Sequence, residues 1–105
     1  MKKTILTGLK PSGQLHIGNY LGTAINWGKY IDEYDCYYFI ADLHSLTELR
    51  EEYSKERKSK EIFEMIVDAL SLGVDPDKCV FFVQSHVQEH AELAWIFNCI
   101  TPMAF

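Results

Sequence analysis

The stretch that decides the fold lies between residues 8 and 20 and reads GLKPSGQLHIGNY. Residues 4–9, which lead into it, are mostly β-branched or apolar and predict a short strand. The Pro-Ser-Gly cluster at 11–13 is typical of a turn. From residue 17 to about residue 33, apolar or small residues recur every three or four positions and predict one face of a helix: Ile17, Leu21, Ala24, Gly28 and Ile31. The stretch therefore joins a strand to a helix through a tight turn.

A second strand and helix follow. Residues 36–41, CYYFIA, are continuously apolar or aromatic, as expected of a parallel strand that is buried on both faces. The polar stretch 48–60 predicts the solvated face of a helix. On this face Arg57 and Glu61, four residues apart, are expected to form an ion pair. Further along, this helix acquires an apolar side, formed by Ile62, Ile66, Ala69 and Leu70. Gly73 is expected to end the helix.

The third pair completes the pattern. Residues 80–83, VFFV, predict a strand, and a helix is expected from Ser85 to about Ile100, with Ser85 and Gln88 at capping-box spacing. Strands that alternate with helices predict an α/β fold, in particular a Rossmann-like open parallel sheet within 1–105. Because a sheet of three strands is narrow, we expect this chain to be part of a longer domain.

Composition limits the classes of function. Fifteen acidic residues against ten basic ones give a net charge of −5, so the sequence does not predict a broad nucleic-acid surface. The three cysteines are far apart in sequence and predict reduced thiols rather than disulfides or a cysteine zinc site. No apolar run is long enough for a membrane span or a signal peptide, so we expect a cytoplasmic protein without membrane contact.

The turn after the first strand is where parallel sheets bind ligands. Backbone N–H groups at a helix start attract phosphate, and His16 and Asn19, three residues apart, share a face there and can donate hydrogen bonds. Such donors suit phosphoryl or nucleotidyl transfer. The alternative is a histidine that only caps or packs. The loop matches neither the P-loop nor the dinucleotide fingerprint, so both classes are disfavoured.

Two other interpretations remain open from the residues. His86, Glu89 and His90 spell H-x-x-E-H, which on a helix could bind zinc as in a zinc peptidase. A non-enzymatic nucleotide-sensing or dimerising module is also possible, with Trp95, Phe97 and Ile100 on a dimer face or on an unclosed core.

One set of motifs carries a family resemblance. HIGN at 16–19 looks like a variant of the HIGH signature of class I aminoacyl-tRNA synthetases, with asparagine in place of the last histidine. The longer string GLKPSGQLHIGNYLG, together with FIADLHSLT, LGVDP and FVQS in the same order, resembles the tryptophanyl branch of that family over essentially the whole chain. A cofactor nucleotidylyltransferase, which shares an H-x-G-H-like loop, is the rival that needs no tRNA.

The resemblance implies roles for particular residues. Lys10, Pro11 and Ser12 would line the phosphate and ribose side of ATP, Gly18 would face adenine, and His16 and Asn19 would be the catalytic pair that steadies the phosphates. Leu6 and Gly8, at the end of the first strand, would wall the amino-acid pocket. Three residues at strand ends could also face this pocket: Asp42, His44 and Gln84. For Asp42 and His44, a local strand-end cap is the alternative.

It also implies substrates and partners. The family activates L-tryptophan with ATP, accompanied by Mg²⁺, and transfers it to tRNA(Trp), generally as a homodimer. No residue here is an obvious protein ligand for a metal. The family's KMSKS loop, its indole-reading helix and its anticodon-binding domain lie outside these 105 residues, so we expect the chain alone to be inactive or nearly so.

Overall fold

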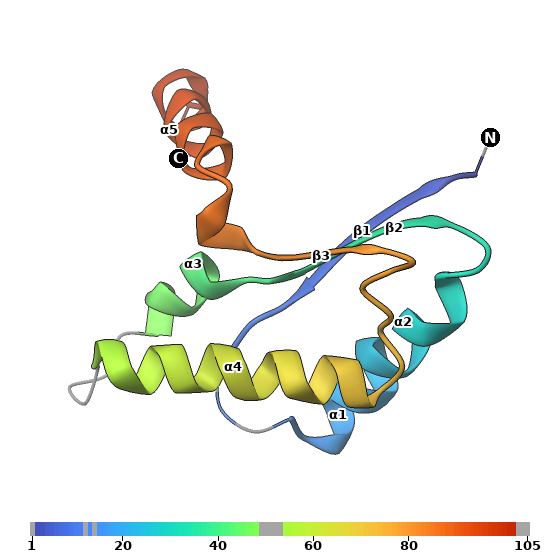
Figure 1. Cartoon of the computed structure of the whole chain (residues 1–105). Helices are drawn as coiled ribbons and strands as arrows, with labels where there is room; N and C mark the ends of the chain where they lie inside the picture. Colours follow the sequence, from blue (N-terminus) through green and yellow to red (C-terminus); the bar gives the residue numbers. More distant parts are fainter. Residues whose placement is uncertain (1, 12, 14, 49–53, 103–105) are drawn as a thin grey trace.

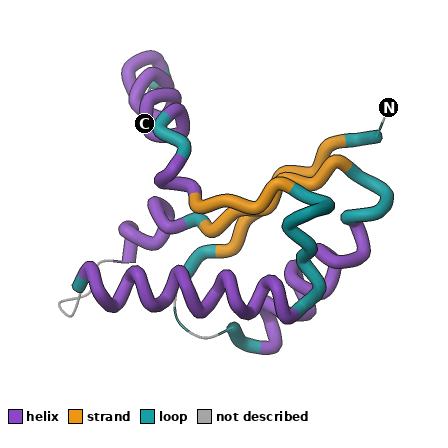
Figure 2. The backbone as a smooth tube through the Cα atoms, in the orientation of Figure 1, coloured by secondary structure: helices purple, strands orange, loops and turns teal. Residues whose placement is uncertain are grey.

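The computed structural model describes residues 2–11, 13, 15–48 and 54–102. Three parallel strands, β1 (Thr4–Leu9), β2 (Asp35–Ile40) and β3 (Val80–Val83), form one sheet in the order β1-β2-β3 (Figure 2). The helices are α1 (Ile17–Asn19), α2 (Ile25–Tyr30), α3 (Asp42–Ser45), α4 (Lys55–Ser71) and α5 (Glu89–Ile100). The predicted open parallel α/β sheet is confirmed. The first and third strands have the predicted bounds, and the second begins and ends one residue early.

The core lies between the sheet and one layer of helices. Both crossovers lead to the same side, so α2 and α4 cover the same face (Figure 1). Trp27 of α2 stacks on Tyr38 of β2 with ring centroids 4.5 Å apart, and the Tyr38 hydroxyl donates to the Trp27 carbonyl oxygen at 2.8 Å. Burial raises the pKa of that hydroxyl, and the Cys36 thiol raises it further. The residues packed around this pair include Ile40, Met65 and Ala69.

The second strand is not buried on both faces, so that prediction is wrong for this structure. Cys36, Tyr38 and Ile40 are buried, whereas Tyr37, which points to the opposite face, is 41% exposed. The physical reason is that α2 and α4 cover one face, while α5 projects away from the end of β3 instead of lying over the other face (Figure 1).

The first predicted helix is interrupted by a wider turn. Residues Tyr20–Ala24 are π-helical, and the Ile25 N–H donates to the Tyr20 carbonyl oxygen five residues back. This turn shifts the register of the buried face, so Ile17 and Leu21 are exposed, contrary to prediction. Ala24, Ile31 and the unpredicted Trp27 form the buried face, and the helix ends at Tyr30 rather than near residue 33.

Helix α4 ends as predicted, although its apolar face differs in detail. Gly73 has φ +96°, its N–H donates to Leu70 O at 3.1 Å, and the Val74 N–H donates to Ala69 O at 3.2 Å. These bonds satisfy carbonyl groups that the end of the helix leaves unpaired. Met65 is buried with Ala69, whereas Leu70 is 43% exposed and does not belong to the face.

The last helix begins later than predicted. Residues Gln84–His86 form a 3₁₀ turn, and α5 starts at Glu89 without a side-chain cap at Gln88. The capping box predicted at Ser85 and Gln88 is therefore wrong. The Ser85 N–H instead donates to Asp42 Oδ1 at 3.0 Å, which ties this turn to the start of α3.

Candidate functional site

The loop after β1 is tied to the rest of the fold by backbone atoms. The Leu9 carbonyl oxygen accepts from the Ala41 N–H at 2.8 Å, and the Pro11 carbonyl oxygen accepts from Lys58 Nζ at 3.1 Å. Pro11 is buried and Lys10 is half-buried. Ser12, which the sequence predicts at the phosphate side, lies outside the described residues. The backbone is thus tied at Leu9 and at Pro11 where the chain leaves the carboxyl edge of the sheet.

The predicted catalytic pair forms a capping box at the start of α1. His16 Nδ1 accepts from the Gly18 N–H at 3.1 Å and from the Asn19 N–H at 3.4 Å, while Asn19 Oδ1 accepts from the His16 N–H at 3.3 Å. The predicted proximity of the two side chains is confirmed, and capping, the simpler alternative, describes what they do here. Because Nδ1 accepts, these bonds assign the neutral ring's proton to Nε2, which is left as a donor.

Gly18 has a packing reason to be glycine. A Cβ on this residue would lie 3.0 Å from both Cε1 and Nδ1 of His16, closer than ordinary contact. The missing side chain therefore makes room for the imidazole in its capping position. Gly18 is itself exposed, so its surface is open to a ligand.

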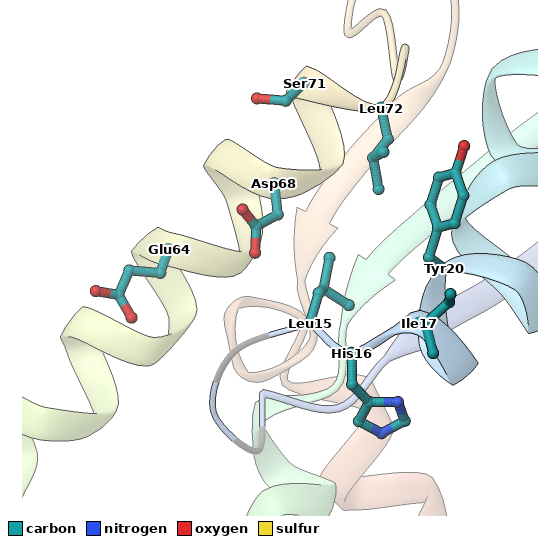
Figure 3. Close-up of a pocket in the computed structure, with 8 residues that line it drawn as sticks. All are labelled: Leu15, His16, Ile17, Tyr20, Glu64, Asp68, Ser71 and Leu72. Carbon is teal, nitrogen blue, oxygen red and sulfur yellow. The ribbon is translucent and has the colours of Figure 1, made fainter.

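A recess of about 690 Å³ lies between this helix start and α4 (Figure 3). Its lining residues are Leu15, His16, Ile17, Tyr20, Glu64, Asp68, Ser71 and Leu72. The carboxylates of Glu64 and Asp68 belong to the α4 wall, and the His16 imidazole points away from α4 (Figure 3). Two like charges beside the opening oppose the binding of a triphosphate in this recess.

Leu6 and Gly8 belong to the uncovered face of the sheet. They pair with Tyr37 and Phe39 of β2, and Leu6 is 64% exposed. A Cβ on Gly8 would lie 2.6 Å from Cε2 of the Phe39 ring, so a glycine at this position leaves room for that ring. Both predicted pocket residues therefore lie side by side on an open, largely aromatic surface.

Sequence reasoning missed the aromatic residues that continue this surface. Phe39 stacks with Phe82 of β3 at a centroid distance of 5.5 Å, and the His90 ring lies parallel to Phe82 at 6.1 Å. The signal was available, because parallel strands place Gly8, Phe39 and Phe82 in the same register.

The remaining predicted pocket residues have different surroundings. Asp42 accepts from the Ser85 backbone, so it joins the ends of β2 and β3. Gln84 Oε1 is buried and has no hydrogen-bond partner among the described residues, which leaves an acceptor at the end of β3. His44 is exposed in α3, and its carbonyl oxygen accepts from Thr47 Oγ1 at 2.8 Å. Asp42 and Gln84 are therefore close in the fold.

The geometry required for a zinc peptidase is not formed. His86 lies in the 3₁₀ turn and His90 in α5, so the two do not face one ligand from a single helix. His90 instead stacks on Phe82, and its Nδ1 lies 3.3 Å from the Gln84 carbonyl oxygen. Within 2–11, 13, 15–48 and 54–102 no three metal-binding side chains cluster.

The far end of α5 is open to solvent. Trp95, Phe97 and Ile100 are 70%, 53% and 69% exposed, which fits either an interface or a surface that another segment covers.

None of the helices in the described part of the chain has the length and apolar character of a transmembrane span.

Comparison with known proteins places this geometry in a family. The sequence model of the tRNA synthetases class I (W and Y) matches residues 2–104. The tryptophan–tRNA ligase of Rickettsia bellii is 46% identical over 105 residues, covering 100% of this chain and 31% of that protein. The chain thus spans about a third of the length of the curated relatives it matches.

Solved structures agree with the sequence match. Tryptophanyl-tRNA synthetase from Campylobacter jejuni superposes with a TM-score of 0.84 at 38% identity, over 97% of this chain and 31% of that one. The structure of the same enzyme described in complex with ADP and tryptophan also superposes with a TM-score of 0.84, at 40% identity, over 95% of this chain and 30% of that one. These matches confirm the resemblance inferred from the motifs. With its strand-loop-helix site and a family match over nearly its full length, the chain belongs to the class I tRNA synthetases (W and Y).

Proposed function

We propose that this chain supplies the ATP-binding half of a tryptophan–tRNA ligase active site. The observation that carries the proposal is the loop 10–19, which leaves the carboxyl edge of the sheet and ends in a helix start capped by His16 and Asn19. Relatives named tryptophan–tRNA ligase, and a similar structure holding ADP and tryptophan, support it. Residues 1–105 would form part of a Rossmann-like catalytic domain.

The proposed chemistry begins with adenylate formation. A carboxylate oxygen of L-tryptophan attacks the α-phosphorus of ATP, and pyrophosphate leaves. His16 donates from Nε2 and Asn19 from its amide to phosphate oxygens, because the cap already uses His16 Nδ1 and Asn19 Oδ1. Such fixed donors stabilise charge without reorganising during the reaction. Lys10, Pro11 and Ser12 line the phosphate and ribose side, and Gly18 faces the adenine.

The amino acid is proposed to lie on the uncovered face of the sheet. Leu6 and Gly8 form its wall beside Phe39, and an indole ring suits an aromatic surface of this kind. Gln84 and Asp42 stand at the strand ends next to it, and the buried Gln84 Oε1 offers an acceptor. His44 remains the weakest member of this set, since it is exposed in α3.

The remaining parts of the proposal concern partners. Mg²⁺ enters with ATP and is bound by phosphate oxygens rather than by a dedicated protein site. In the second step, the 3′-terminal hydroxyl of tRNA(Trp) attacks the acyl carbon and AMP leaves. Because this chain carries a net charge of −5, the main tRNA contacts are proposed to lie on other parts of the protein or on a local patch of this segment. A homodimer in the cytoplasm completes the proposal.

The test is a titration of the isotope-labelled chain with Mg-ATP, followed by backbone amide chemical shifts. Shifts are expected at Lys10, Gly13 and residues 16–19. His16→Asn is the matched variant, because asparagine also caps helices but lacks the imidazole donor. It should keep α1 folded and weaken ATP binding. Shifts centred on Glu64 and Asp68, or none at millimolar ATP, would contradict the proposal.

A second measurement separates the ligase from a cofactor nucleotidylyltransferase. Exchange of pyrophosphate into ATP, however slow in this chain, should require tryptophan and no other amino acid. Exchange that requires a phosphate-bearing cofactor precursor as the acceptor of AMP, and no amino acid, would favour the nucleotidylyltransferase.

A further inference from the structure

Lys58 of α4 contacts the loop that follows β1, although Lys58 itself belongs to none of the family motifs. Its Nζ donates to the Pro11 carbonyl oxygen at 3.1 Å, across 47 positions of sequence, and to Glu61 Oε2 at 2.7 Å. Its side chain is only 20% exposed, and that of Glu61 is 13% exposed. Bonds of an ammonium group in such partial shelter are stronger than those of exposed surface pairs.

Glu61 holds Lys58 in this position. One carboxylate oxygen accepts from Lys58, and the other accepts from Arg57 Nε at 3.1 Å, the ion pair predicted from sequence. The hydrogen bond from Lys58 holds the pKa of Glu61 below its ordinary value, against the opposing effect of burial, with Arg57 adding to the lowering. The carboxylate therefore stays ionised at neutral pH and keeps the ammonium in one place.

The loop depends on this bond more than on an ordinary surface contact. Proline has no N–H, so its carbonyl oxygen is the one backbone hydrogen-bonding group that Pro11 possesses. Pro11 is buried, and a buried carbonyl without a donor is costly. The chain is held by Ala41 at Leu9 and by the capping box at His16, and Lys58 adds a tie at Pro11 between these two points.

We propose that Lys58, oriented by Glu61, is a positioning residue that fixes the Pro11 backbone, at the start of the loop after β1, for binding of the triphosphate of ATP. This inference rests on the proposed function. Lys58 acts through the Pro11 carbonyl, since two of its three ammonium hydrogens serve Pro11 and Glu61 and the bond to Pro11 is its contact with the loop. The residue is thus a determinant of triphosphate affinity that lies 39 positions after Asn19, the last residue of the HIGN motif.

The experiment compares Lys58→Met with Lys58→Arg and Lys60→Met. Lys60 lies on the same helix and pairs with Glu64 at 3.7 Å in an exposed position, so Lys60→Met removes a like charge without touching the loop. Hydrogen exchange of the segment 8–20 is measured first. It should accelerate about tenfold in Lys58→Met, as expected for the loss of one charge-assisted bond, and remain unchanged in Lys60→Met.

Nucleotide affinity is measured next, with Mg-ATP and adenosine as probes. Lys58→Met should raise the dissociation constant for ATP about tenfold and leave that for adenosine within twofold. A general loss of structure would affect both ligands. Lys58→Arg should recover most of the ATP affinity, because a guanidinium can also donate to the Pro11 carbonyl.

The two proposals fail in different ways. If the unchanged chain binds no ATP, the proposed function is contradicted. If loop exchange in Lys58→Met equals that of the unchanged chain, or if ATP and adenosine weaken equally, the inference about Lys58 is overturned whatever the unchanged chain binds.

Discussion

Replacing Gly8 by alanine tests whether the end of β1 is shaped by the Phe39 ring. The added Cβ would lie 2.6, 2.7 and 2.8 Å from three carbons of that ring. Carbon atoms normally pack about 3.5–4.0 Å apart, so the ring must retreat by roughly 1 Å. Its contacts oppose this movement, because the ring stacks on Phe82 at 5.5 Å and lies 6.3 Å from the His90 ring.

The expected cost follows from overpacking. Inserting a methyl group into a packed site costs about 1–3 kcal/mol, and we expect roughly 1–2 kcal/mol here because Phe39 is half-buried and can partly rotate. For a chain of this size that corresponds to a fall in Tm of roughly 4–16 °C. Thermal and urea unfolding followed by circular dichroism measure it directly.

A double variant shows whether Phe39 is the cause. Phe39→Leu removes ring atoms from the crowded position, so Gly8→Ala combined with Phe39→Leu should lose less stability than the sum of the two single losses. An unchanged Tm in Gly8→Ala would refute the steric argument, and so would strict additivity in the double variant.

Four further outcomes are expected. His16→Ala should lower stability by about 1 kcal/mol through loss of the cap, with His16→Asn close to the unchanged chain, as measured by urea unfolding. Because the pKa of Glu61 is lowered from its ordinary 4.5, the ionised Glu61 stabilises the fold above pH 4.5, and this contribution is lost as the pH falls through the lowered value. Glu61→Gln should therefore weaken the pH dependence of the free energy of unfolding in acid. An unaltered pH dependence would count against the Lys58 contact. Gly73→Ala, at φ +96°, should cost about 1–2 kcal/mol in the same unfolding assay. Burial, together with Cys36 and Asp75, raises the pKa of the Cys79 thiol, so at pH 7.5 iodoacetamide should label the exposed Cys99 well before Cys79, as read by mass spectrometry, and equal rates would contradict this burial.

The strands and the fold class could be predicted because short apolar runs stand between strong turn residues. Thr4–Leu9 and Val80–Val83 have the predicted bounds, and Gly73 ends α4 where its sequence position suggests. In the candidate site, the three-residue spacing of His16 and Asn19 was enough to predict that they meet. These features depend on neighbours in sequence.

What could not be predicted depends on distant parts of the chain. The continuous apolar run around Tyr37 predicts that this residue is buried, but its exposure depends on where α5 lies. The contact of Lys58 with Pro11 spans 47 positions and has no local signature. The wide turn at Tyr20–Ala24 also follows from no single residue type, so the exposure of Leu21 was predicted wrongly.

The wide turn at Tyr20–Ala24 divides the helix into two segments with different surroundings. The segment beyond it is fixed by Trp27 and Ile31, which fill the interior, whereas the segment before it presents Ile17 and Leu21 to solvent. Substitutions at the solvent end can therefore accumulate without disturbing the interior. Closing Tyr20–Ala24 into a regular α-helix, with no residue removed, would rotate the leading end, with His16 and Asn19, by about 100°. The extra residue held in this turn therefore sets the direction of the proposed ligand-facing end.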